Sequence, residues 1–222
     1  MSAGSGTGGG VEALYPFLYD DGSAIDAVLD EVRASTARKA AEIAELRRSL
    51  SGLLGEDLTA CARRLAEAFR GGGRLFAFGN GGSCTDAQDL AQMFLRPPWG
   101  RPLPAFSLTG DVAALTALSN DVGFEVVFAR QLAAFGRRGD VAVGLSTSGG
   151  SANVLCAFEE ASRLGMVTVG FAGYGGGAMA EAGTVAHMFA VPSPSVHRIQ
   201  EAQTTAYHVL WELVQRALDD RL

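Results

Sequence analysis

Apolar runs alternate with helical patterns along most of the chain. Five short apolar runs predict strands, at residues 74–78, 104–108, 141–145, 167–171 and 187–191. Between them, apolar residues recur at helical spacing and predict helices at 84–95, 111–118, 122–134 and 152–164, with a short one near Ala178. Strands that alternate with helices form right-handed βαβ units. The pattern therefore predicts an α/β fold with a parallel sheet covered on both faces.

Longer amphipathic segments stand on either side of this alternation. One begins near Ile25 and continues to Leu50, a second covers 58–70, and the last runs from about Arg198 to Leu218. The first is longer than a lone domain usually needs, so it either packs on another subunit or lies across its own sheet. We expect residues 1–22 to be a flexible tail and lead-in, and residues 23–222 to be a single domain.

A glycine-rich turn follows the first predicted strand, as Gly79-Asn80-Gly81-Gly82-Ser83. Ser83 suits the N-cap of the next helix, with Asp86 three residues later in an approximate capping box. Glycines let a ligand approach the backbone closely, and a helix N-terminus with free N–H donors attracts anions. The turn therefore predicts an anion site, although an ordinary strand-to-helix turn would look similar.

A second turn of this kind follows the strand at 141–145, as Ser146-Thr147-Ser148-Gly149-Gly150-Ser151. Two such loops at the carboxyl ends of strands in one parallel sheet predict a pocket for a phosphorylated ligand at a switch point. Neither loop has the lysine of a P-loop or the full G-x-G-x-x-G spacing, so nucleotide binding is not favoured. The candidate binding residues are Asn80, Gly81, Gly82, Ser83, Ser146, Thr147, Ser148 and Ser151.

Composition narrows the classes of protein further. The chain of 222 residues is 48% hydrophobic and 19% charged, which is typical of a globular protein with a large core. A net charge of -6 argues against direct nucleic-acid binding. The three cysteines are too scattered for a disulfide framework and fit a reducing compartment. No apolar run approaches the roughly 18 residues of a membrane span, so we expect a soluble cytoplasmic protein without membrane partners.

Four blocks in order carry a family resemblance: 79–83, 119–125 (Ser-Asn-Asp-Val-Gly-Phe-Glu), 146–154 and 198–201 (Arg-Ile-Gln-Glu). The chain resembles the sugar isomerase (SIS) domain, and within it the phosphoheptose isomerases, from about Ile25 to Leu218. The resemblance implies a five-stranded parallel sheet in a flavodoxin-like α/β/α sandwich with long terminal helices. It also implies a homotetramer with sites at subunit contacts, acting on a phosphorylated sugar.

The reaction that the resemblance implies converts sedoheptulose 7-phosphate into a heptose 7-phosphate aldose through an enediol. Such chemistry needs a base near the reacting carbons, an acid at the oxygens and an anchor for the phosphate. Gln200 and His208 match the family's Gln and catalytic His. Asp89 and Met93 stand where the family has a His and its Glu base. A thioether accepts no proton at ordinary pH. Two alternatives follow: Asp89 is a substitute base with His208 as the acid, or His208 is the base of a rearranged mechanism.

Other residues of the resemblance leave alternatives open. Asn120 and Asp121 either approach the sugar or cap the following helix. No cofactor is required, although some relatives bind zinc, and His208, Gln200 and Asp89 could together supply ligands to it. Because the Glu is replaced by Met93, a second function stays open: a non-catalytic SIS protein that binds a sugar phosphate as a signal, or serves as a scaffold. The DnaA initiator-associating protein is a relative of that type, and it likewise lacks the Glu.

Overall fold

The structure is a computed structural model that describes residues 22–222. The chain divides into two compact units, Met1–Glu45 and Leu46–Leu222, which are described separately. The expected tail at 1–22 lies almost wholly outside the described residues. The expectation of one domain over 23–222 stays a prediction.

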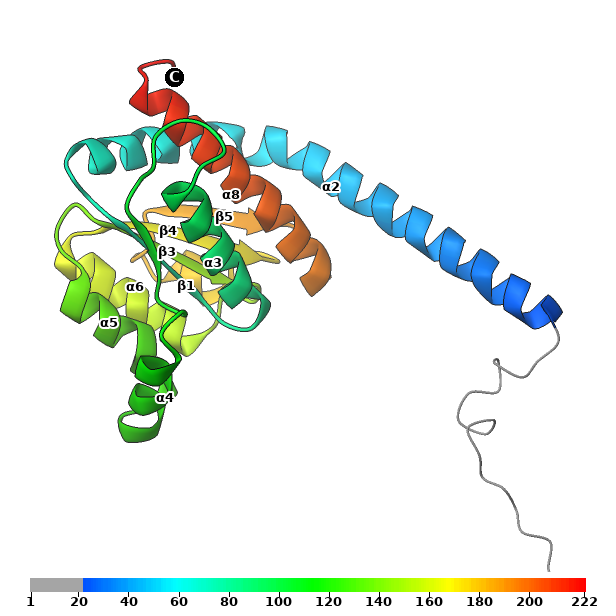
Figure 1. The fold of residues 1–222 in the computed structure, drawn as a ribbon, viewed down its shortest axis with the longest axis horizontal. Helices are drawn as coiled ribbons and strands as arrows, with labels where there is room; N and C mark the ends of the chain where they lie inside the picture. Colours follow the sequence, from blue (N-terminus) through cyan, green and yellow to red (C-terminus); the bar gives the residue numbers. More distant parts are fainter. Residues whose placement is uncertain (1–21) are drawn as a thin grey trace, which may run out of the picture. The chain divides into compact units, whose positions relative to one another are not determined.

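A five-stranded sheet is the centre of the larger unit (Figure 1). Its strands are β1 (Leu75–Gly79), β2 (Ala105–Ser107), β3 (Val141–Ser146), β4 (Val167–Gly173) and β5 (His187–Val191). All neighbouring pairs are parallel, in the order β2-β1-β3-β4-β5. The predicted parallel sheet is confirmed, with its switch point between β1 and β3, where the chain turns from one direction of growth to the other.

Helices cover both faces of the sheet, which confirms the sandwich. They are α3 (Gly82–Leu95), α4 (Val112–Asp121), α5 (Val127–Phe135), α6 (Ala152–Leu164), α7 (Gly177–Glu181) and α8 (Val196–Leu218), with a 3-10 turn, η2 (Phe124–Val126), before α5. Figure 1 shows α3 and α8 on one face and α5 and α6 on the other. Within residues 22–222, no helix is both long enough and apolar enough to cross a bilayer.

Aromatic packing fixes the face of the sheet toward α5 and α6. The Phe78 ring lies 5.5 Å from the rings of Phe128 and Phe158, centroid to centroid. Gly144 on the neighbouring strand makes room for them, because a Cβ there would lie 2.5 Å from the Phe158 ring. This packing holds the N-terminal half of α6, and with it the loop after β3, against the sheet.

The predicted break between the first two helices is wrong. One helix, α2 (Gly22–Arg70), continues through Gly52 and Gly55. A glycine inside a helix costs only about 1 kcal/mol, and Leu50, Leu54 and Leu58 keep a buried face across the expected gap.

The part of α2 within the smaller unit carries an apolar stripe on its surface. The members of this stripe share helical spacing and are between 43% and 55% exposed: Ile25, Val28, Leu29 and Val32.

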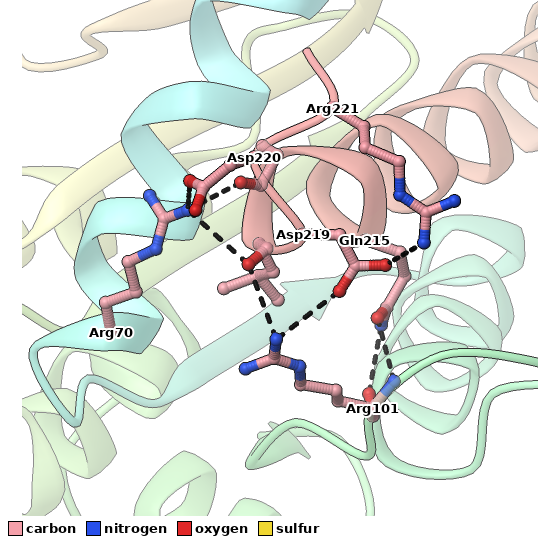
Figure 2. Close-up of polar contacts among 8 residues, drawn as sticks. Arg70, Arg101, Gln215, Asp219, Asp220 and Arg221 are labelled. Atoms are coloured by element: carbon pink, nitrogen blue, oxygen red, sulfur yellow. Dashed lines mark hydrogen bonds and ion pairs between the residues drawn. The ribbon is translucent and has the colours of Figure 1, made fainter.

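Two arginines hold the end of α8, as Figure 2 shows. Arg70, the last residue of α2, donates to the carbonyl of Ala217 at 2.6 Å and pairs with Asp220. Arg101, in the loop between α3 and β2, pairs with Asp219 at 3.3 Å. Gln215 receives a hydrogen bond from the Arg101 backbone N–H at 2.9 Å and donates to its carbonyl at 3.0 Å. Positive charge at a helix C-terminus also complements the helix dipole, so these contacts stabilise the end of α8.

Candidate functional site

The first loop, Asn80–Ser83, begins α3 differently from the prediction. Gly81 is the N-cap, with φ of 56°, and Ser83 is the second residue of the helix and only 4% exposed. A left-handed N-cap favours glycine over serine, which explains the error. The Ser83 N–H donates to the carbonyl of Asn80 at 3.0 Å. Among the described residues, the N–H groups of Gly81 and Gly82 have no partner, so they remain available to an anion.

The second loop, Ser146–Ser151, holds itself together through its hydroxyls. Ser146 and Ser151 hydroxyls lie 2.9 Å apart, and Ser148 accepts from the Gly150 N–H at 3.2 Å. The Gly149 N–H donates to the carbonyl of Ser146 at 3.0 Å. In the described chain, the N–H groups of Thr147, Ser148, Ser151 and Ala152 have no partner. The N–H groups of Gly149 and Gly150 are therefore used within the loop, and those of Thr147, Ser148, Ser151 and Ala152 remain available to an anion.

A reciprocal amide pair joins the two loops. Asn80 donates to the side-chain oxygen of Asn153 at 2.8 Å, and Asn153 donates back to that of Asn80 at 2.9 Å. Asn153 lies in the first turn of α6 and is 3% exposed. β1 and β3 are neighbours with Gly79 opposite Leu145. The loops therefore lie side by side at the switch point, each at the N-terminus of a helix.

Helices α3 and α8 bring the predicted acid–base residues together. His208 Nε2 lies 3.5 Å from Asp89 Oδ2, and the two side chains are about half exposed. The hydroxyl of Tyr207 donates to the same Asp89 oxygen at 2.8 Å. Burial is the main reason that the pKa of Tyr207 is raised, so the phenol stays protonated.

Gln200, on α8, lies against the start of α3, near Asp86. A Cβ on Gly82 would lie 2.0 Å from Nε2 of Gln200, so glycine is needed for this approach. Burial raises the pKa of Asp86 to about 6, the nearby Gln200 opposes the shift, and the charge of Asp89 adds to it. Asp86 Oδ2 is buried without a hydrogen-bond partner. Asp86 therefore holds a proton into the range in which proton transfer at neutral pH is efficient.

A pocket of about 390 Å³ opens beside Asp89 and His208. Its lining combines polar and apolar side chains: Asp89, Gln92, Met93, Arg96, Pro98, His208 and Trp211. Trp211 packs against Trp99 with the two rings tilted at 59° and their centroids 5.0 Å apart. Trp99 belongs to the same loop as Arg101, so the contacts that hold the end of α8 also hold one wall of the pocket.

Two of the three possible zinc ligands lie together. His208 Nε2 is 3.5 Å from Asp89 Oδ2, which also accepts a hydrogen bond from Tyr207. Gln200 lies against Gly82 at the start of α3. Within residues 22–222, no group of three His, Cys, Asp or Glu side chains could hold a metal. A catalytic zinc site has three protein ligands, and of the three candidates the structure shows Asp89 and His208 in contact.

Asn120 and Asp121 stand apart from this arrangement. They hydrogen-bond to each other at 2.8 Å at the exposed end of α4, which packs on η2 and α5. In the described part of the chain, neither forms a hydrogen bond to the first or second loop.

The sequence analysis missed Tyr207 and the pairing role of Asn153. In the sequence, Asn153 is marked only by its place in the block 146–154, and Tyr207 only by its place before His208.

Comparison with known proteins agrees with this architecture. The model of the SIS domain family matches residues 40–173. A phosphoheptose isomerase from Roseiflexus sp. (strain RS-1) is 44% identical over 195 residues, which cover 86% of this chain and 93% of that protein. One from Desulfovibrio desulfuricans is 46% identical over 191 residues, covering 85% and 88%. A solved phosphoheptose isomerase from Neisseria gonorrhoeae superposes with a TM-score of 0.77 at 35% identity, over 82% of this chain and 98% of the other. The chain belongs to the SIS domain family.

Proposed function

We propose that this chain is a phosphoheptose isomerase that converts sedoheptulose 7-phosphate, or a related sugar phosphate, into the aldose through an enediol. One observation carries the proposal: two glycine- and serine-rich loops, joined by Asn80 and Asn153, lie at the switch point of the sheet. Relatives named phosphoheptose isomerase, which match the chain over most of its length, support the same activity.

The second loop is the proposed anchor for the phosphate. Its free N–H groups point from the start of α6, where the helix dipole adds positive potential. The hydroxyls of Ser146, Thr147, Ser148 and Ser151 add donors. Asn80, Gly81, Gly82 and Ser83 would then bind the sugar chain or share the phosphate. The anchor fixes the substrate, so that the reacting carbons meet the acid and base in one geometry.

Asp89 and His208 are the proposed proton-transfer residues. The Asp89 carboxylate takes a proton from C1 of the ketose, and the electron pair left behind forms the C1–C2 double bond of the enediol. His208 gives a proton to the C2 oxygen. A proton then returns to C2 while the O1 proton leaves, which gives the aldehyde and restores both residues. Gln200 is the proposed hydrogen-bond partner of the sugar hydroxyls. No step is routed through zinc, because the donor set is incomplete.

The alternative of a non-catalytic regulator or scaffold is not favoured. It was raised by Met93, but a carboxylate remains one turn away at Asp89, within 3.5 Å of an imidazole nitrogen. The relatives reported above are named as isomerases.

We further propose that the protein acts in the cytoplasm as a homotetramer with sites at subunit contacts. The exposed stripe at Ile25, Val28, Leu29 and Val32 offers a helix face for a second copy. The α4–η2 segment, which exposes Val122 and Phe124 beside Asn120 and Asp121, offers another. Light scattering on the purified protein would give four chains per particle, and a monomer would contradict the assembly.

The test of the function is isomerisation of sedoheptulose 7-phosphate in D₂O. The proposal predicts aldose formation and deuterium at the carbon beside the carbonyl. Asp89→Asn should lower kcat by about 100-fold or more, because general-base catalysis contributes 10²–10⁴. Asp30→Asn, which changes an exposed carboxylate of the smaller unit, is the matched control. Thermal stabilisation by the sugar phosphate without exchange would instead indicate the regulator.

A further inference from the structure

Asp89 needs a restraint if it is to act as a base. Its side chain is short and 56% exposed, and the hydrogen bonds described for it, to Tyr207 and His208, both come from α8. The contact to His208 Nε2 is long, at 3.5 Å. The shorter contact to Asp89 comes from Tyr207, whose hydroxyl lies 2.8 Å from Oδ2. This bond crosses between α8 and α3, 118 residues apart in the chain.

Tyr207 is itself held rigidly. It is 1% exposed, and its ring meets that of Phe171 edge to face, with centroids 6.4 Å apart. The Tyr207 ring also contacts the His208 imidazole, with centroids 5.3 Å apart and the rings tilted at 42°. Because burial raises the pKa of Tyr207, its phenol is protonated at neutral pH and remains a hydrogen-bond donor. One immobile side chain therefore touches both members of the acid–base pair.

We propose that Tyr207 is a positioning residue that aligns Asp89 and His208 for proton transfer, an inference that rests on the proposed isomerase function. Its hydroxyl binds Asp89 Oδ2 and leaves Oδ1 to face the substrate. Its ring sets the plane of the imidazole. Met93 cannot act as a base. By orienting Asp89, Tyr207 helps that carboxylate to take the role instead.

A purely structural role makes a different prediction. A buried tyrosine hydroxyl needs some hydrogen-bond partner, and Thr204 Oγ1 lies within reach at 3.5 Å on the same helix. If the hydroxyl served stability alone, its removal would change the melting temperature and leave the chemistry of Asp89 and His208 as it was. Positioning instead predicts a loss in the chemical step.

The experiment compares Tyr207→Phe with the wild type and with Tyr174→Phe. Tyr174 is 46% exposed, and its hydroxyl donates to the carbonyl of Pro194 at 3.4 Å, so this control removes a phenol hydroxyl elsewhere. We expect Tyr207→Phe to lower kcat for isomerisation at least about tenfold, with KM within about twofold and an unchanged fold. Tyr174→Phe should keep the wild-type values.

A second readout does not need turnover. The imidazole ¹⁵N resonances of His208, assigned with His208→Gln, should move in Tyr207→Phe and stay in place in Tyr174→Phe. Resonances that do not move in Tyr207→Phe would overturn the positioning role, as would wild-type kcat in an active enzyme. If the wild type itself fails to isomerise the sugar phosphate, the proposed function fails, and the resonances alone decide whether Tyr207 aligns the pair.

Discussion

The amide pair between Asn80 and Asn153 is the most direct point at which to perturb the site. Asn153→Ala would remove both hydrogen bonds, of 2.8 and 2.9 Å, and leave the amide of Asn80 without its partner. Asn153 is buried in the first turn of α6, and it is not among the residues that we propose to bind the substrate. It therefore separates the alignment of the two loops from the contacts that they make.

The expected loss of stability is about 2 kcal/mol. Each net hydrogen bond contributes about 1 kcal/mol, and Asn153 is 3% exposed, so water does not replace it there. Asn80 is half-buried and would regain part of its hydration, which offsets the further cost of an orphaned amide. For a protein of this size, the loss corresponds to a fall of about 4–8 °C in melting temperature.

A double-mutant cycle tests the reasoning. Asn80→Ala, Asn153→Ala and the double variant would be unfolded in urea, and the coupling energy should be about 1–2 kcal/mol, because either change alone breaks the same pair. Asn120→Ala, which alters an exposed amide, should cost less than about 0.5 kcal/mol. Thermal stabilisation by the sugar phosphate should weaken in both single variants. Additive single effects, with a coupling near zero, would refute the idea that this pair joins the loops.

Three further changes test other parts of the site. Gly82→Ala would push the flexible amide of Gln200 away, since its Cβ would lie 2.0 Å from Nε2. Gly82→Ala should therefore lower kcat/KM about tenfold. Gly55→Ala is the control, because nothing lies within 4 Å of a Cβ there, and an equal loss in this control would argue against displacement of Gln200 as the cause. Met93→Glu restores a carboxylate in the pocket and should raise kcat/KM about tenfold or more; unchanged turnover would contradict this. Burial raises the pKa of Asp86 from 3.8 to about 6, so its ionised form costs stability above pH 6, and the cost fades as the pH falls toward 3.8. Asp86→Asn should therefore stabilise the protein by about 1–2 kcal/mol at pH 8 and hardly at all at pH 4, whereas a pH-independent difference in urea unfolding would speak against it.

Local patterns predicted the sheet because each strand is a short, mainly apolar run. β3 and β4 are buried along their whole length, as parallel strands covered on both faces must be. The neighbouring positions of the two loops then followed from topology, since β1 and β3 meet at the switch point.

Local sequence patterns did not predict the N-cap of α3 or the continuity of α2. The N-cap moved from Ser83 to Gly81 because backbone geometry, and not side-chain preference, begins α3. The continuity of α2 depended on tertiary burial of Leu54, which outweighed the two glycines around it.

The side-chain contacts of the site were beyond prediction for a different reason. The bond between Tyr207 and Asp89 joins positions 118 residues apart, and that between Asn80 and Asn153 joins positions 73 apart. Each depends on how far one helix is rotated against another, which periodicity fixes only to a broad face. Asp89 and His208 were identified through family positions, but the residue that aligns them has no counterpart in the motifs.

The arginine contacts in Figure 2 bear on how this protein can be handled in the laboratory. Asp219 and Asp220, which directly follow α8, pair with Arg101 and Arg70, so these two residues belong to the folded unit. Trimming the chain before Asp219 would remove the acidic partners of both arginines. Shortened variants made for enzymology should therefore keep both aspartates.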